Sequence, residues 1–433
     1  MYEHNFERPG VERSREMRTL KAKMRGVVLP IVLLALVGQA RAQIMASDET
    51  AGYVVYPKIV VADSGAVGGF GIDTLIQLTN TNDSDDTTVH CWYVKANGHC
   101  SNDPDTVCTP ENFRTVCPRG GLCLPGWSPA NFEITLTREQ PAAWSAGNGL
   151  SVDFPPGGVI PNSAVNERPF IGELKCVQVE GPGADSPPDD RNDLKGEATI
   201  IRVQDPSAPL LPPRMDAAAY NAIGFEAVEG TSGSSDDGAP LCLGDLPEGG
   251  PATECAMEYA PCPNTLILDH FFDGAQPPFG VSAVVRTELT LVPCSEVLAE
   301  GASNGEVRGP VVTAQMLVYN EFEQRFSTST RVDCYRNTAL ADIDTAPGPS
   351  DDAYSLFAAG VQGTTTGQTR IRGVVGPENG VGYGLIGVAQ EFYSETATDP
   401  VNASTAFNLH ADIGFREEGD AVYEVNTFVT PGP

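Results

Sequence analysis

The chain has 433 residues, of which 57 are acidic and 27 are lysine or arginine, and its net charge at pH 7 is −30. A surface of this charge repels nucleic-acid phosphates and anionic lipid headgroups, so the composition argues against nucleic-acid and membrane-surface partners. The 45 glycines and 35 prolines indicate a chain with many turns.

The first 42 residues carry the features of an upstream extension followed by a secretory signal peptide. A basic stretch at 18–25 precedes an apolar run at 26–38, and Ala-Arg-Ala ends at Ala42. The apolar run is shorter than the roughly 20 residues that a membrane-spanning helix needs, although an uncleaved anchor is the alternative. We therefore expect cleavage after Ala42, no membrane insertion afterwards, and a secreted, periplasmic or extracellular protein.

All 11 cysteines follow the expected cleavage site, in a compartment that permits disulfides. Five of them crowd into 91–123, a stretch rich in Asn, Asp, Pro and Gly that cannot build a core and needs covalent closure. Neither the close pairs of a structural zinc site nor the C-x-x-C-H of covalent haem occurs, so we predict no metal or cofactor here. The disulfide candidates are Cys91, Cys100, Cys108, Cys117, Cys123, Cys176, Cys242, Cys255, Cys262, Cys294 and Cys334.

The stretch "HCWYVKANGHC" (90–100) predicts a strand that enters this stapled loop. Its Asn-Gly step at 97–98 favours a two-residue hairpin turn. In the register of such a hairpin Cys91 does not face Cys100, so we expect Cys91 to pair with Cys176. One cysteine of the odd total is left over. The remaining cysteines of the loop would close it among themselves: Cys100, Cys108, Cys117 and Cys123.

Alternation of apolar and polar residues predicts an all-β chain of half-buried antiparallel strands. The clearest example is "TAFNLHADIGF" (405–415). Short helices are expected at 215–223 and 351–360. The expected strands are 58–61, 73–80, 87–94, 131–137, 169–180 and 192–203 in the first half, then 265–268, 286–293, 312–319, 325–332, 382–393 and 402–413.

The two sets of strands correspond in order and spacing, which indicates an internal duplication, with chance similarity as the alternative. We predict two tandem antiparallel β-sandwiches, Ig-like or jelly-roll-like, at 43–228 and 264–433. The first carries the disulfide-stapled loop insert at 97–127, and a Gly/Pro/Cys linker at 229–263 joins the two.

Candidate catalytic groups are few, and we predict no catalytic residue. "GASNG" places Ser303 in a G-x-S-x-G motif, but the strand-to-helix context that this motif needs is missing from the sequence around it. His270 lies among apolar neighbours and is expected to be packed, whereas His410 is expected on a solvated strand face.

The acidic turn at 80–86 offers the weak calcium candidates Asp83, Asp85 and Asp86. The turn does not reproduce the D-x-[DN]-x-[DN]-G pattern of a calcium-binding loop, and a plain turn between strands is the favoured interpretation.

These features favour an exported, acidic, non-enzymatic structural or binding protein whose partner is an unknown protein or glycan. Fold class alone does not establish function, so two alternatives stay open. One is a secreted polysaccharide-active hydrolase, for which Trp127 and Trp144 would be the aromatic platforms. The other is a calcium-dependent adhesin.

Overall fold

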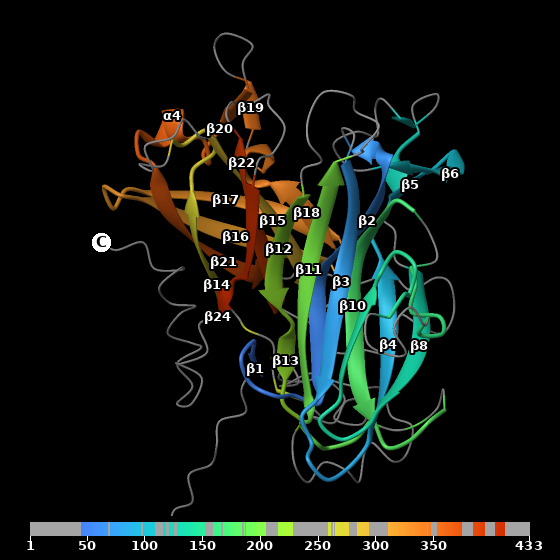
Figure 1. Ribbon diagram of the computed structural model, residues 1–433. Helices are drawn as coiled ribbons and strands as arrows, with labels where there is room; N and C mark the ends of the chain where they lie inside the picture. The colour runs from blue at the N-terminus through green and yellow to red at the C-terminus, as the bar shows by residue number, and fades with distance from the viewer. Residues whose placement is uncertain are drawn as a thin grey trace, which may run out of the picture. The chain divides into compact units, whose positions relative to one another are not determined.

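The computed structural model describes residues 45–411 with gaps, and its regular structure is almost entirely β (Figure 1). The all-β prediction is therefore confirmed. The residues that are not described are 1–44, 68–69, 97, 109–115, 118–120, 125–127, 152–158, 166–167, 184–185, 187, 205–214, 228–258, 261–262, 264, 277–283, 294–310, 334, 344, 348–352, 375–383, 395–402 and 412–433.

The first half forms two antiparallel sheets joined by one long strand, β2 (Tyr53–Val67). The first part of β2 pairs with β13 on one edge and with β10 on the other. Its last part, at Ala62 and Val67, pairs with β3. Sheet A has the order β1-β13-β2-β10-β4-β8, and sheet B has the order β12-β11-β3 with β9 also beside β3 (Figure 1). The bounds are β1 Met45–Ala46, β3 Phe70–Asn80, β4 Thr87–Lys95, β8 Ser128–Leu136, β9 Pro141–Ser145, β10 Phe170–Val179, β11 Leu194–Gln204, β12 Met215–Asn221 and β13 Ile223–Phe225.

Sheets A and B enclose an apolar core because each strand turns alternate side chains inward. Tyr56, Cys91 and Leu174 of sheet A meet Ile76 and Trp144 of sheet B, and all five side chains are completely buried. The first half is therefore a β-sandwich.

The second half forms a second sandwich. Sheet C has the order β17-β16-β21-β14-β24, and sheet D has the order β18-β15-β22-β23. Leu268 and Met316 of sheet C pack on Leu289 and Ala389 of sheet D in one core cluster. The bounds are β14 Thr265–Phe271, β15 Val284–Pro293, β16 Val311–Asn320, β17 Arg325–Asp333, β18 Arg336–Ala339, β21 Thr366–Val374, β22 Leu385–Ser394, β23 Ala403–Asn408 and β24 His410–Ala411.

Smaller elements connect and extend these sheets. β5 (Gly98–Cys100), β6 (Asp103–Cys108) and β7 (Cys123–Leu124) form a three-stranded sheet of their own in the cysteine-rich insert. The short strands β19 (Thr345–Pro347) and β20 (Ala353–Ser355) pair with each other. The remaining elements are the 3-10 helix η3 (Leu340–Asp342) and α4 (Ala359–Gln362), a single helical turn.

Every strand that the sequence predicted overlaps an observed strand, but the last is divided between two sheets. β23 pairs with β22 in sheet D, whereas β24 pairs with β14 in sheet C. Ala406 consequently belongs to the core of the first half and Leu409 to the core of the second. The regular alternation of 402–413 does not reveal this change of sheet.

The two predicted helices are wrong. Residues 215–223 form β12 and β13, because Ala218 and Tyr220 turn the same face into the core with a period of two. In 351–360 the structure has β20, and α4 begins only at Ala359.

The predicted hairpin at 97–98 is also wrong. β4 is already hydrogen-bonded to β10 on one side and to β8 on the other, so it has no free edge for β5. β5 pairs with β6 and β7 instead.

The chain divides into two compact units, 1–42 and 43–433. The division coincides with the predicted cleavage point, although cleavage itself and the proposed domain boundaries remain predictions. Across the described ranges, no helix combines the length and the apolar character that a membrane span requires.

Within the unit 43–433, the outer face of sheet A is covered by side chains of the second half. Tyr53 and Val177 of sheet A share a core cluster with Val292 of β15 and Ile386 of β22. Polar contacts accompany this packing: the Ser404 backbone N–H and hydroxyl both donate to the carboxylate of Asp216, at 3.0 and 2.5 Å. The two sandwiches therefore share a dry, partly polar interface.

A β-bulge in β2 places a lysine in that interface. The register sets Pro57 and Lys58 opposite the single residue Glu173, an arrangement that suits a proline because it has no N–H to donate. Lys58 is 1% exposed and forms an ion pair with Glu288 of β15, which is 26% exposed. Burial lowers the pKa of Lys58, partly opposed by Glu288. Burial raises the pKa of Glu288, but Lys58, Arg202 and a hydrogen bond from Asn337 together outweigh it and the net shift is downward.

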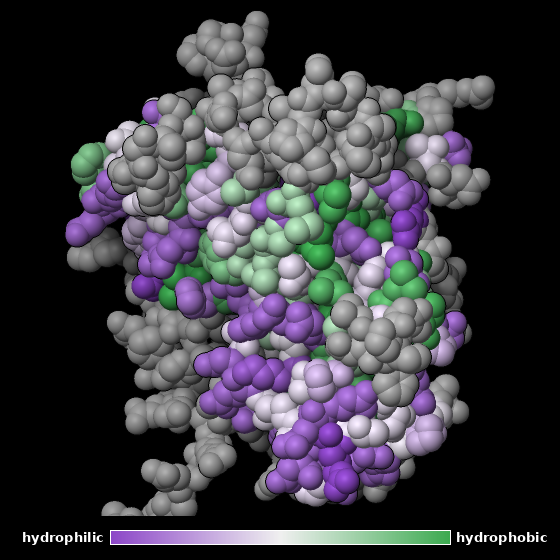
Figure 2. All heavy atoms as spheres, viewed as in Figure 1, coloured by the Kyte–Doolittle hydropathy of each residue, from purple (hydrophilic) through white to green (hydrophobic). Residues whose placement is uncertain are grey.

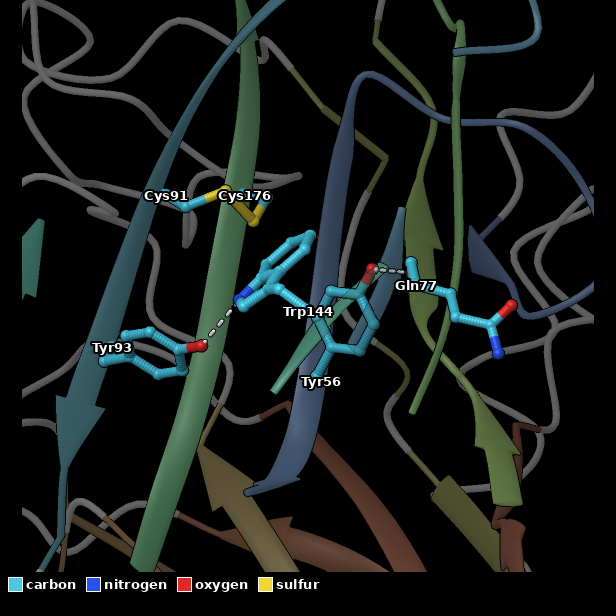
Figure 3. Close-up of a disulfide and its surroundings, with 6 residues drawn as sticks. All are labelled: Tyr56, Gln77, Cys91, Tyr93, Trp144 and Cys176. Carbon is cyan, nitrogen blue, oxygen red and sulfur yellow. Dashed lines mark hydrogen bonds between the residues drawn. A yellow bond between two sulfur atoms is a disulfide. The ribbon is translucent and has the colours of Figure 1, made fainter. Parts of the chain in front are cut away.

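A disulfide ties two neighbouring strands of the first core. The register of β4 and β10 sets Cys91 directly opposite Cys176, and the two are bonded as the sequence predicted (Figure 3). Beside it the Trp144 indole N–H donates to the Tyr93 hydroxyl at 3.0 Å, and both rings are buried.

Removing one partner of the buried ion pair should destabilise the protein unequally. Glu288→Gln leaves the fully buried Lys58 charge unpaired, so we expect a loss of about 3–5 kcal/mol in the free energy of unfolding. Lys58→Met should cost less, because Glu288 keeps contact with solvent. The double variant Lys58→Met/Glu288→Leu should recover most of the loss. Urea unfolding measures all three; equal losses under about 1 kcal/mol for both single variants would contradict the role given to this pair.

Replacing both cysteines of the cross-strand disulfide by alanine should also destabilise the first sandwich. The bond closes a loop with a sequence separation of 85, so the expected cost is about 2–4 kcal/mol. Thermal unfolding of Cys91→Ala/Cys176→Ala against the unmodified protein measures it. An unchanged midpoint would show that the register alone holds these strands.

Candidate functional site

A pocket of about 570 Å³ lies where β14 and β16 end and β21 begins, at one end of the second sandwich. Besides His270, three aromatic side chains, three carboxylates and two carboxamides line it. These side chains are Phe271, Tyr319, Phe407, Asp269, Glu321, Glu391, Asn320 and Gln368. A concave site with apolar rings and a few convergent polar groups is the usual form of a small-ligand site.

Strand alternation explains which side chains face the pocket. In β14, Leu268 and His270 point into the core, whereas Asp269 is exposed and Phe271 is half-buried. The registers then align Asp269 with Gln368 of β21, and Gln368 with Tyr319 of β16. Three strands thus contribute one continuous row on the outer face of sheet C.

Two of the carboxylates lie on either side of Phe271. Asp269 Oδ1 accepts a hydrogen bond from Gln368 Nε2 at 2.9 Å. Glu391 reaches across from sheet D, where Oε1 accepts from the Phe271 backbone N–H at 3.5 Å and Oε2 accepts from the Tyr393 hydroxyl at 2.7 Å. Both carboxylates are thus oriented by hydrogen bonds while lining the same space.

Glu321, which lines the pocket, holds the start of β21 by accepting hydrogen bonds. Its Oε1 accepts from the backbone N–H groups of Thr365 and Thr366, at 3.2 and 2.9 Å, and from the Thr366 hydroxyl at 2.8 Å. These hydrogen bonds, led by that from the Thr366 N–H, lower the pKa of Glu321. A carboxylate held in this way is poorly suited to deliver a proton.

His270 supports the pocket from beneath, as the sequence predicted for a packed histidine. It is 4% exposed, its Nε2 lies 2.8 Å from the Thr369 hydroxyl, and its ring meets Phe272 edge-on. Burial lowers the pKa of His270 to about 4, partly offset by its hydrogen bond to the Phe271 carbonyl. The imidazole is therefore neutral at pH 7. His410 is exposed, as expected.

The three calcium candidates do not form a ligand cluster. Within the described ranges, Asp83, Asp85 and Asp86 are not part of any group of three ligand atoms lying within 4.8 Å of one another. The turn is instead held by its own side chains, since Asn82 Oδ1 accepts from the Ser84 and Asp85 backbone N–H groups. Calcium binding here remains a prediction.

Positive charge is already present beside this turn. The Arg191 guanidinium lies 2.6 Å from Asp189, 3.5 Å from Asp193 and 3.8 Å from Asp85. Hydrophilic residues gather at this end of the first-half strands, the lower end in Figure 2. The arginine therefore does part of the charge neutralisation that a cation would supply.

Trp144 cannot be the predicted sugar platform. Its side chain is completely buried and hydrogen-bonded to Tyr93, because β9 turns it into the core between the sheets. Trp127 lies outside the described residues. Trp92, on the opposite face of β4 from Cys91, stacks on His90 with ring centroids 4.3 Å apart.

Three cysteines of the insert are disulfide-bonded and so are not available to a metal. The sulfurs of Cys100, Cys108 and Cys117 lie within 4.8 Å of one another. Cys100 is joined to Cys117, and Cys108 is disulfide-bonded as well, so none offers a thiolate. The side chain of Cys123, the disulfide candidates Cys242, Cys255, Cys262, Cys294 and Cys334, and the rejected Ser303 motif lie outside the described part of the chain.

Comparisons with known proteins do not assign this chain to a family. No family model matches it, and no curated protein matches it. Among solved structures, the crystal structure of the CupB6 tip adhesin from Pseudomonas aeruginosa aligns with 83% of this chain and 98% of that chain, at 9% identity and a TM-score of 0.11. A TM-score this low carries no argument about function.

Acid should destabilise the protein partly through His270. Its pKa is about 4 in the folded state and near 6.5 when unfolded, so the unfolded chain takes up a proton first as the pH falls. The stability lost between pH 6.5 and 4 should reach about 3 kcal/mol from this group. His270→Gln, which cannot titrate, should lose correspondingly less over the same range in urea unfolding. The exposed His410→Gln is the control, and equal acid sensitivity of His270→Gln and the unmodified protein would contradict this assignment.

Proposed function

We propose that the protein is an exported, non-enzymatic binding protein of the cell surface or matrix, and that it recognises a glycan at the pocket beside β14. The observation that carries the proposal is the combination of three aromatic rings with hydrogen-bonding carboxylate and carboxamide groups in one pocket. Sugar rings present apolar C–H faces to aromatic rings, and their hydroxyls both donate and accept hydrogen bonds.

The disulfides support export. Cys91–Cys176 and Cys100–Cys117 would persist in an oxidising compartment, whereas cytosolic reductants would oppose them. The predicted signal peptide points to the same compartment.

The rigidity of the pocket supports binding as its role. Asp269, Phe271 and Gln368 belong to regular strands. Gln368 donates a hydrogen bond to Asp269, and the Phe271 backbone N–H and the Tyr393 hydroxyl donate to Glu391. Groups held in place before the ligand arrives lose little conformational entropy on binding, which favours affinity.

Binding to a glycan array, followed by calorimetry on the best ligand, tests the proposal. Phe271→Ala and Asp269→Ala should each weaken binding by about tenfold, because a stacking surface or a charged acceptor is lost. Val159→Ala, an exposed site in the first half, is the matched control and should bind normally. The absence of binding to any glycan would contradict the proposal.

The same pocket carries the alternative of a polysaccharide hydrolase, because Asp269 and Glu391 both line it. Turnover of the bound glycans distinguishes the two functions. Release of reducing ends that is abolished in both Asp269→Asn and Glu391→Gln would establish the hydrolase and overturn the binding-only proposal.

A further inference from the structure

The outer face of sheet C concentrates arginines in a chain of net charge −30. In β17 the side chains of Arg325, Ser327, Ser329 and Arg331 are exposed and alternate with less exposed ones. In β21, Arg370 and Arg372 are half-buried on the same face, since Thr369 and Ile371 between and beside them are buried. We call the set Arg325, Arg331, Arg370 and Arg372, with the polar residues between them, the arginine face.

The registers place this face directly beside the pocket. Tyr319 of β16 aligns with Gln368 on one side and with Arg325 on the other, so the row that lines the pocket ends in an arginine. Arg370 and Arg372 follow Gln368 along β21 on the same face of the strand. Their Cα atoms lie about 7 Å apart, because a strand rises about 3.4 Å per residue. The pocket and the arginine face thus form one surface.

On this face, the residues of β16 and β17 between the arginines are uncharged, and all but the apolar Leu317 can form side-chain hydrogen bonds. Gln315 of β16 pairs with Arg372 on one side and with Ser329 of β17 on the other. Leu317 of β16 likewise pairs with Arg370 on one side and with Ser327 of β17 on the other. Gln315, Ser327 and Ser329 are exposed. The surface therefore combines separated positive charges with hydroxyl and amide groups.

The arginines differ in how far their charge is already balanced. Arg331 Nε donates to Asp333 Oδ1 at 2.6 Å, and Arg370 is also engaged, with its Nε donating to Gln368 Oε1 at 3.5 Å. Among the described side chains, no carboxylate lies within ion-pair distance of Arg325 or Arg372. The face consequently keeps positive charge that an anionic ligand would neutralise.

We infer that this surface binds an acidic polysaccharide, whose sugar rings occupy the pocket and whose carboxylate or sulfate groups pair with Arg325 and Arg372. The inference rests on the proposed function and names its ligand class. Guanidinium groups bind planar oxyanions through paired, charge-assisted hydrogen bonds, and the intervening hydroxyls and amides suit a polymer that is rich in hydroxyls as well as charged.

The observations favour a polysaccharide over two other anionic occupants. Double-stranded nucleic acid carries one charge per roughly 1.7 Å, so it would meet stronger long-range repulsion from a chain of net charge −30 than a polysaccharide whose charges are spaced by whole sugar units. Binding of a second copy through an acidic surface would need a large buried interface. The pocket beside the arginines instead has the size that suits a small unit such as a sugar ring.

The test compares charged and neutral forms of the same polymers. Oligogalacturonate and its fully methyl-esterified form, and dextran sulfate and dextran, are titrated by calorimetry in 50 mM and 500 mM NaCl. At least one acidic form should bind about tenfold or more tightly than its neutral counterpart, and the difference should shrink at high salt because screening weakens exposed ion pairs. Arg372→Gln should weaken binding of the acidic form about fivefold or more, and Arg325→Gln/Arg372→Gln should remove its advantage.

A matched variant controls for net charge. Arg286→Gln changes an exposed arginine of sheet D that pairs with Asp342, so it lowers the charge equally without altering the arginine face. It should leave affinity unchanged, and thermal melting of each variant confirms folding. A loss of affinity in Arg286→Gln equal to that in Arg372→Gln would reduce the effect to net charge and overturn the inference.

The remaining outcomes separate the inference from the proposed function. Equal affinity for acidic and neutral forms would overturn the inference and leave glycan binding intact. No binding of either form, together with no binding on the glycan array, would overturn both. Equal affinity for a DNA duplex would overturn the acidic polysaccharide in favour of nucleic acid. Self-association in sedimentation velocity that the double variant abolishes would overturn it in favour of a second copy of the chain.

Discussion

The ion pair between Lys58 and Glu288 is the contact on which the arrangement of the unit 43–433 depends. A lysine that is 1% exposed is tolerated only where an opposite charge meets it, and that charge comes from β15 of the other sandwich. The bulge at Pro57 and Lys58 aims the side chain out of sheet A, toward the second half. The same interface also contains apolar contacts, such as those of Tyr53 with Val292 and Ile386. Because the charges must meet, the ion pair specifies one way of docking the two sheets where apolar surfaces alone would permit several.

This docking leaves one broad sheet face of the second sandwich free for ligands. Sheet D turns its outer residues toward the first half, where Val388 joins the first core. Sheet C carries exposed side chains on its outer surface, including Arg325, Gln315 and Asp269. The arginine face and the strand ends beside the pocket therefore belong to sheet C, whereas sheet D faces the first sandwich. In a strongly acidic chain, the arginine face is the natural place for an anionic ligand to approach.

Much of the fold could be predicted from the sequence, because alternation is a local property. Each strand that was expected from its pattern is present, and Cys91 was correctly paired with Cys176. The failures were non-local. "MDAAAYNAI" is rich in alanine and suggests a helix, but the neighbouring strand β11 recruits it into sheet B. The Asn-Gly step at 97–98 is a strong turn signal, yet both edges of β4 are occupied by strands from elsewhere in the chain.

The candidate site could not be predicted for the same reason. Asp269, Tyr319, Gln368 and Glu391 come from four strands, and only the cross-strand register brings them together. β21, which supplies Gln368 and two arginines, was not among the expected strands, since "TGQTRIRGV" has few large apolar residues. Trp144 was selected by residue type alone, and its position in β9 turns it into the core.

The two sandwiches form one cooperative unit locked by a buried ion pair, and scanning calorimetry of the chain from Gln43 tests this most directly. We predict a single transition whose calorimetric enthalpy equals its van't Hoff enthalpy. Two separate transitions, or a calorimetric enthalpy well above the van't Hoff value, would show that the sandwiches unfold independently and would contradict the account.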